Sequence, residues 1–289
     1  MMEKINIAYC YKSGMGIEIA RIGTWLSVLT KTCDVTLYSF HHYIYDPAVM
    51  KVRPLTEMNH ADVVLGDADE GIAFYSHSRP NGPLRAHVLE EEARQRGYHM
   101  ITEEAADGTN VYQTSLNQVD EAGLKMAGEG KFLKMGKPHG RFILNIFGGA
   151  CLSKGIREGN AAKIVARGIA EAFPEIEFII PCLPHQKNIL LEEVVTKVKN
   201  LALCNFGYDD EEFTLLVSGS PRIITVEGGM LHLGTAYRKP VFCLIEKKWM
   251  MSVVNKLPLD HGVHYELLEF SSPHMGILIE SIKEWMHGR

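Results

Sequence analysis

Short apolar runs that alternate with amphipathic segments are the feature that most constrains the fold of this chain. Residues 5–10 form a short, mainly apolar run, a loop with Gly14 and Gly16 follows, an amphipathic stretch continues to about Leu29, and residues 35–40 again have the composition of a strand. This order predicts a strand, a helix and a second strand. Because strands and helices continue to alternate along the chain, we predict an α/β fold with mostly parallel sheets.

A segment rich in glycine, lysine and proline separates two such regions. Residues 128–140 read GEGKFLKMGKPHG and have weak periodicity, which is typical of an interdomain linker. We therefore predict two Rossmann-like domains that face a cleft, at residues 1–137 and 138–272, and an amphipathic C-terminal helix at 273–289.

The other elements follow from the same periodicities. In the first domain we expect strands at 61–65, 72–75 and 98–101 and a helix at 84–96. In the second domain we expect strands at 142–147, 176–180, 201–206 and 241–245, helices at 160–173, 189–199 and 211–217, and a strand, turn and helix within 223–240.

Composition excludes several classes of protein. The chain has 289 residues, of which 46% are hydrophobic, so it can bury a large core. A net charge of -5 gives no overall attraction to nucleic acid, and we expect no nucleic-acid partner. The six cysteines form no CxxC pair, and no apolar run approaches the roughly 18 residues of a membrane helix. We therefore predict a cytoplasmic protein with reduced cysteines.

An acid and two glycines end the apolar run that begins at Ile223. In open α/β sheets, ligands bind beyond the carboxyl ends of the strands, where Glu227, Gly228 and Gly229 lie. The glycines allow a ligand to approach, the N-terminus of the next helix favours an anion, and His232 in its first turn can reach the same point. We predict that a phosphate binds here and that Glu227 contacts sugar hydroxyls. The alternative interpretation is a tight turn with a structural histidine.

The segment EGGMLHLGTAYRKP at 227–240 resembles the donor-binding signature of the lipopolysaccharide heptosyltransferases, a family of GT-B glycosyltransferases. Three further segments match in order over about residues 142–245. Ser153 and Lys154 resemble the pair on the donor phosphates, Gln186 stands where the family usually has a glutamate on the ribose, and Tyr208 where a residue contacts the nucleobase. The resemblance implies a donor site formed by Ser153, Lys154, Gln186, Tyr208, Glu227, Gly228, Gly229, Met230 and His232.

The N-terminal loop departs from the family pattern. Met15 and Gly16 resemble the family's acceptor-side loop, in which the next residue is an aspartate proposed as the catalytic base; here it is Ile17. Because isoleucine cannot accept a proton, we expect Glu18, Asp67 or Asp69 to act as the base.

Metal binding is not expected. Asp67 and Asp69 have an Asp-x-Asp spacing, but this short motif is more often a solvated turn. His41 and His42 are adjacent, so their side chains point in different directions, and no acid or cysteine completes a recognisable metal site.

The resemblance implies an enzyme: an inverting, metal-independent glycosyltransferase that moves a sugar from a nucleotide-diphosphate donor to a saccharide or lipid-linked saccharide, such as lipopolysaccharide. It also implies that the helix at 273–289 crosses back to the N-terminal domain. Residues 247–251 (KKWMM) combine cations with apolar bulk and are a candidate for peripheral membrane contact. The alternatives are a nucleotide-sugar hydrolase or epimerase on the same scaffold, and a non-catalytic protein that binds a nucleotide sugar or a partner enzyme.

Overall fold

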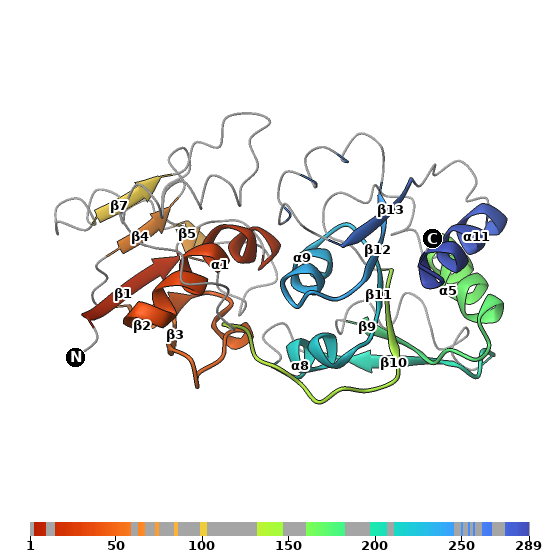
Figure 1. Cartoon of the computed structure of the whole chain (residues 1–289), viewed down its shortest axis with the longest axis horizontal. Coiled ribbons are helices and arrows are strands. Elements are labelled where there is room, and N and C mark those ends of the chain that lie inside the picture. Colours follow the sequence, from red (N-terminus) through yellow and green to blue (C-terminus); the bar gives the residue numbers. More distant parts are fainter. Residues whose placement is uncertain are drawn as a thin grey trace. The chain divides into compact units, whose positions relative to one another are not determined.

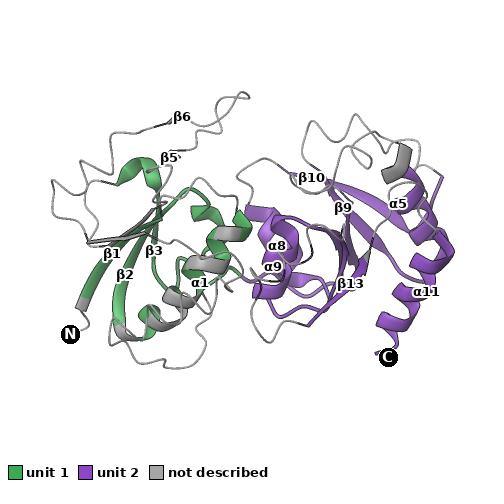
Figure 2. Ribbon diagram, turned by 90° about the horizontal axis from the view of Figure 1, so that it is seen from above, with its two compact units in different colours: residues 1–134 green, residues 135–289 purple. Residues whose placement is uncertain are grey.

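The computed structural model of the chain contains two compact units, Met1–Lys134 and Met135–Arg289 (Figure 2). The sequence-based boundary, after residue 137, falls in the same connecting segment. The structure describes the following residues: 3–9, 15–58, 63–66, 73–74, 84–85, 99–102, 132–146, 160–182, 197–206, 211–245, 250, 254, 257, 262–267 and 275–288.

Unit 1 is built on a five-stranded sheet of order β3-β2-β1-β4-β7, in which every pair of neighbours is parallel (Figure 1). Helix α1 (Met15–Thr32) joins the first two strands, and two short 3₁₀ helices, η1 (His42–Ile44) and η2 (Leu55–Glu57), follow β2 and β3. The strands are β1 (Glu3–Tyr9), β2 (Cys33–Ser39), β3 (Lys51–Pro54), β4 (Val63–Gly66) and β7 (His99–Thr102).

The buried residues of helix α1 recur with the period of an amphipathic helix. Helix α1 buries Ile19, Ile22, Leu26 and Leu29, which recur at helical spacing along one face. Strand β3 was not predicted from the sequence, because this edge strand is short, carries exposed cations and ends in Pro54.

One prediction for unit 1 is wrong. Residues 84–85 do not begin a helix: β6 (Leu84–Arg85) pairs antiparallel with β5 (Ala73–Phe74). The sequence Pro-Asn-Gly-Pro before Leu84 is a turn signal that favours such a hairpin over a helix. The rest of the expected helix lies outside the described residues.

Unit 2 is built on a six-stranded parallel sheet of order β10-β9-β8-β11-β12-β13. The predicted strands are confirmed, the last strand was not predicted, and most of the expected helix at 189–199 lies outside the described residues. The strands are β8 (Phe142–Asn145), β9 (Phe178–Cys182), β10 (Leu201–Asn205), β11 (Ile223–Val226), β12 (Val241–Ile245) and β13 (Val263–Leu267); the helices are α5 (Asn160–Ala172), α8 (Glu211–Gly219), α9 (Gly229–Ala236) and α11 (Met275–Met286).

Helices cover both faces of this sheet, with α5 and α11 on one side and α8 and α9 on the other (Figure 1). Leu144, Ile224 and Phe242 point to the first side and pack in the cluster formed by α5 and α11. Ile223 and Val241 point to the opposite side, where a methyl group on Gly234 of α9 would meet them both. The central strands therefore lack polar and apolar alternation, as expected for a doubly covered parallel sheet.

The C-terminal helix has its described contacts in unit 2. Helix α11 belongs to this unit and lies beside α5 (Figure 2), and the expected crossing to the N-terminal domain is not confirmed. Its apolar face is already used there: Leu278 and Ile282 are buried, the Trp285 ring lies 5.5 Å from that of Phe242, and Arg222 stacks on Trp285 at 5.1 Å.

Both strand orders have a topological switch point. In unit 2, strands β9 and β10 lie to one side of β8 while β11, β12 and β13 lie to the other; in unit 1 the order reverses in the same way between β1 and β4. Open α/β sheets bind ligands at the carboxyl ends of the strands at such points. The candidate sites are therefore the ends of β8 and β11, and those of β1 and β4.

The segment before β8 docks closely on the end of α8, and this contact can be tested. The Gly136 N–H donates to Ser218 Oγ at 2.5 Å and the His139 N–H donates to the Gly219 carbonyl at 2.9 Å. A Cβ on Gly136 would lie 2.0 Å from the Leu215 carbonyl oxygen, whereas one on Gly140 would meet open space.

We expect Gly136→Ala to lower the free energy of unfolding by about 1–3 kcal/mol, because backbone must move to admit the methyl group. The matched control, Gly140→Ala, should be neutral or slightly stabilising. Urea denaturation of both variants checks this, and equal stability of the two would contradict the close docking.

Candidate functional site

The turn between β11 and α9 is the most sharply defined feature at the unit 2 switch point. All four residues of β11 are buried, and the strand ends just before Glu227. Gly228 then takes φ 146° and ψ -169°, a region that is essentially restricted to glycine. Helix α9 begins at Gly229, as the sequence predicts. We call residues 227–229 the β11–α9 turn.

The first turn of α9 offers backbone donors at this turn. The Leu231 N–H donates to the Gly228 carbonyl at 3.1 Å, and among the described residues no side-chain hydrogen bond caps the helix. The earliest N–H groups of any helix lack intrahelical acceptors, and they carry the positive end of the helix dipole. Gly228 and Gly229 are partly exposed, so an anion can reach these groups.

Glu227 places an acceptor beside those donors. Its Oε2 atom is buried and has no hydrogen-bond partner among the described residues. A buried carboxylate oxygen without a donor is costly, so this atom is suited to accept from hydroxyl groups of a ligand. Burial, and then the Glu227 charge, raise the pKa of the Cys243 thiol, which therefore stays neutral.

A row of polar side chains crosses the sheet at the level of Thr225, two residues before Glu227. Asn145, Thr225, Cys243 and Tyr265 are register partners on β8, β11, β12 and β13, so they point to the same face, toward α9. Asn145 Nδ2 donates to Thr225 Oγ1 at 3.0 Å, which in turn donates to the Val226 carbonyl at 2.7 Å. Burial, and to a smaller extent the electrostatic interaction with Cys243, raise the pKa of Tyr265, so its hydroxyl stays protonated. We call these residues the polar row.

Sequence reasoning missed the polar row, although a signal was present. Each member is a polar or sulfur-containing residue inside a short run that otherwise reads as a buried strand, as in FILN and VFCLI. Buried polar groups in such strands need partners, and their common register is visible only in the folded sheet.

The remaining predicted residues of the α9 segment lie inside the unit. His232 is 3% exposed in the first part of α9, where its carbonyl accepts from Thr235 Oγ1 at 2.9 Å, and Met230 is buried. The structure thus brings Glu227, Gly228, Gly229, Met230 and His232 to one strand–helix connection.

The other predicted donor residues, Ser153, Lys154, Gln186 and Tyr208, lie outside the described residues. The strands before them end at Asn145, Cys182 and Asn205. Because β8, β9, β10 and β11 are all parallel, the chain leaves these strands at the sheet edge that also carries Glu227.

In unit 1, the predicted base Glu18 lies in the first turn of α1, which begins with Met15 and Gly16. Glu18 is 1% exposed, and both of its carboxylate oxygens are engaged. Oε1 accepts from the hydroxyls of Ser39 and Tyr45, the latter at 2.6 Å, and Oε2 lies 2.7 Å from His41 Nδ1. Such a carboxylate is placed to orient its neighbours more readily than to contact a substrate.

Tyr45 is fixed in this group as a donor. Burial, and then the charge of Glu18, raise the pKa of Tyr45 well above its usual value. The other two predicted bases, Asp67 and Asp69, follow β4 across the switch point from β1 and lie outside the described residues.

In the described parts of the chain, no group of three or more His, Cys, Asp and Glu side chains is arranged to hold a metal ion. The helices that the structure describes include none of the length and apolarity that a membrane span requires.

Comparison with known proteins identifies the fold. No protein-family model matches the sequence, and no curated protein matches it. Among solved structures, the E. coli heptosyltransferase WaaC with ADP is similar with a TM-score of 0.62 and 11% identity, over 97% of this chain and 100% of that chain. A family 9 glycosyl transferase from Veillonella parvula has a TM-score of 0.62 and 11% identity, over 100% and 99%.

The iron-containing heptosyltransferase TibC from E. coli, in complex with ADP-D-beta-D-heptose, has a TM-score of 0.55 and 9% identity, over 99% of this chain and 78% of that chain. These likenesses span nearly the whole chain and include both parallel sheets. The protein therefore has the GT-B fold of the heptosyltransferases.

Proposed function

We propose that this protein is a glycosyltransferase that binds a nucleotide-diphosphate sugar at the β11–α9 turn and transfers the sugar to a saccharide. The observation that carries the proposal is Glu227 Oε2, a buried acceptor without a donor among the described residues, next to the positive-φ glycine that opens α9. A sugar joined to a diphosphate presents hydroxyl donors directly beside an anion. The β11–α9 turn offers the complementary groups: the Glu227 carboxylate for the hydroxyls and the N-terminus of α9 for the anion.

Each predicted residue has a role in this proposal. The diphosphate accepts from the first N–H groups of α9, and Ser153, Lys154 and His232 add donors and positive charge. Glu227 holds the sugar hydroxyls, while Gln186 and Tyr208 contact the nucleoside. The ligands named for the similar WaaC and TibC structures are ADP and ADP-heptose, which makes an adenine nucleotide the first donor to test.

The reaction is a single displacement. An acceptor hydroxyl attacks the anomeric carbon from the face opposite the diphosphate, so the configuration inverts. The charge that develops on the leaving diphosphate is stabilised by Lys154, His232 and the N-terminus of α9. These groups supply what a metal supplies elsewhere, so the proposed reaction is metal-independent. The acceptor class is a saccharide, including a lipid-linked one that residues 247–251 would help to reach at a membrane surface.

Nucleotide binding tests the donor site. By calorimetry in EDTA, we expect one of ADP, UDP, GDP and CDP to bind, and Lys154→Ala and His232→Ala each to weaken binding by about 10-fold to 100-fold, the range for a charged hydrogen bond. Lys137→Ala, an exposed lysine of the same unit, is the matched control and should bind normally. Thermal unfolding of each variant confirms that it is folded. If no nucleotide binds the wild type, the donor site is wrong.

Glu227→Gln separates the sugar from the nucleotide. Because we place Glu227 on sugar hydroxyls, we expect the variant to bind the nucleotide sugar about 10-fold more weakly, whereas the affinity for the nucleoside diphosphate stays the same or rises slightly. Parallel titrations with ADP and ADP-heptose measure this. Equal weakening of both would place Glu227 on the nucleotide instead.

Product analysis tests the reaction. We expect release of nucleoside diphosphate to require a saccharide acceptor, to persist in EDTA, and to give a product whose anomeric configuration, read by NMR, is inverted. Free sugar formed without acceptor would indicate a hydrolase, an isomerised donor would indicate an epimerase, and loss of turnover in EDTA that iron restores would contradict metal independence. Binding without turnover across donors would indicate a non-catalytic role.

A further inference from the structure

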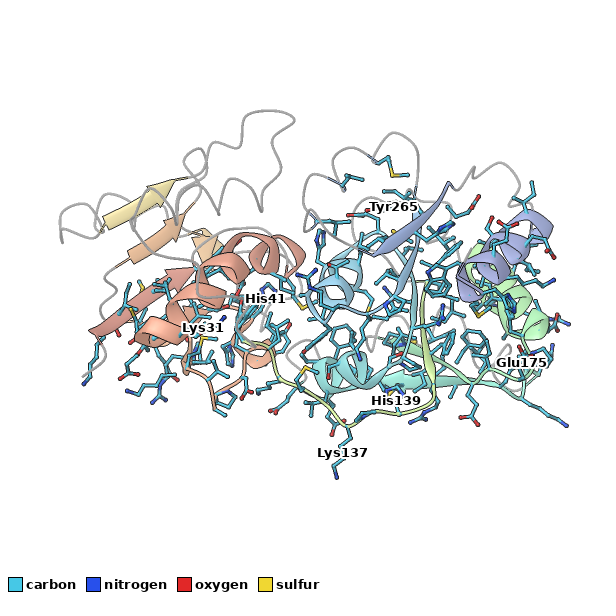
Figure 3. The ribbon with its side chains drawn as sticks, viewed as in Figure 1. Lys31, His41, Lys137, His139, Glu175 and Tyr265 are labelled. Atoms are coloured by element: carbon cyan, nitrogen blue, oxygen red, sulfur yellow. The ribbon has the colours of Figure 1, made fainter. Side chains whose placement is uncertain are left out.

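A carboxylate and a histidine lie together at the carboxyl end of the unit 1 sheet. Strand β2 ends at Ser39 and is parallel to β1, so His41 and the first turn of α1 lie at the same sheet edge. Figure 3 shows His41 beside α1, the helix that carries Glu18. Their contact is direct: Glu18 Oε2 lies 2.7 Å from His41 Nδ1.

The surrounding hydrogen bonds fix the tautomer of this histidine. The hydroxyls of Ser39 and Tyr45 both donate to Oε1 of Glu18, so Oε2 remains as the acceptor for His41. A carboxylate can only accept, so the neutral imidazole carries its proton on Nδ1. Its Nε2 atom is then a base with a lone pair, and the described residues provide it with no hydrogen-bond donor.

The ring is held in place and can still be reached. The His41 N–H donates to Ser39 Oγ at 2.9 Å, and the ring meets those of Phe40 and Tyr43 edge to face at 5.1 Å and 6.0 Å. The side chain remains 11% exposed, against 1% for Glu18. Of the two side chains, that of His41 is the more exposed.

We propose that His41 is the general base of the reaction and that Glu18 is the residue that positions it. This inference rests on the proposed glycosyltransferase function. Position 17 is an isoleucine and supplies no acid, and the carboxylate next to it in the sequence is fully engaged inside the unit. In the pair of Glu18 and His41, the imidazole of His41 takes the place of the missing acid as the base, and Glu18 holds it.

The step balances with the groups named. The acceptor hydroxyl gives its proton to His41 Nε2 while its oxygen forms a bond to the anomeric carbon of the donor. The bond from that carbon to the diphosphate oxygen breaks, and the electron pair leaves with the nucleoside diphosphate. Glu18 stabilises the imidazolium that forms, as the acid of a carboxylate–histidine pair does in hydrolases.

The first test is kinetic, with ADP-heptose as donor and deacylated lipopolysaccharide core saccharide as acceptor. We expect His41→Asn to lower kcat by about 100-fold or more, the usual size of a general-base effect, while the affinity for ADP measured by calorimetry is unchanged. His42→Asn is the matched control: its Nδ1 lies 3.3 Å from the Phe40 carbonyl, outside the pair, and turnover should be normal. His41→Gln provides a second variant if His41→Asn is unstable.

A split between kcat and KM separates positioning from a structural role. We expect Glu18→Gln to lower kcat while the KM for the acceptor and the affinity for ADP change little, because the imidazole remains but its tautomer and orientation are no longer held by the carboxylate. A merely structural Glu18 would lower the amount of folded protein and leave kcat per folded molecule unchanged.

A spectroscopic measurement decides the inference even without turnover. In ¹⁵N spectra of the full chain, the neutral ring of His41 should be protonated on Nδ1, with Nε2 unprotonated; protonation on Nε2 instead would overturn the proposal. Normal turnover of His41→Asn, or loss of turnover in Asp67→Asn or Asp69→Asn alone, would also overturn it while leaving the donor site intact. Failure of the wild type to bind any nucleotide would count against the proposed function itself.

Discussion

The parallel pairing of β8 with β11 is the constraint on which unit 2 depends. Ile143 pairs with Ile223 and Asn145 with Thr225, and strands are added outward from this central pair in opposite directions. Because all the strands are parallel, their carboxyl ends meet along one edge, and the strand order reverses between β8 and β11. The positive φ of Gly228 changes the direction of the chain after β11, so that α9 can begin at Gly229, beside the end of the strand.

The elements of this unit were predictable because their signals are local. Apolar runs such as IITV and VFCLI are short and bounded by glycine or proline, and the start of α9 follows from two glycines after an acid. Strand β13 was missed although a signal was present, because VHYEL alternates apolar and polar residues, a pattern typical of a half-buried strand such as this one, which pairs with β12. The destination of α11 also depends on tertiary packing, since an amphipathic face indicates that a helix is buried but not against what.

The candidate functional residues also divide into those that local sequence predicts and those that only tertiary contacts reveal. Glu227, Gly228 and Gly229 are consecutive, so the sequence alone predicts that they act together. The group around Glu18 joins residues separated by 21 to 27 positions, and its partners are a serine, a histidine and a tyrosine that show no shared pattern. The same carboxylate that looks like a candidate base in the sequence is, in the fold, an internal hydrogen-bond acceptor. Only the contacts distinguish these two chemical roles.

The polar row has a consequence for how uniquely unit 2 can fold. Side chains alternate between the two faces of a strand, so a slip of one residue at β11 would move Thr225 to the face packed by α5 and α11 and separate it from Asn145. The Thr225 hydroxyl would then be buried in an apolar cluster, and the Asn145 amide on the other face would lose its partner. Without these two groups, alternative apolar pairings in a run such as Ile-Ile-Thr-Val would differ little in energy. The polar row thus fixes the register of strands whose apolar residues alone would allow several registers. A fixed register of β11 keeps Glu227 at the sheet edge.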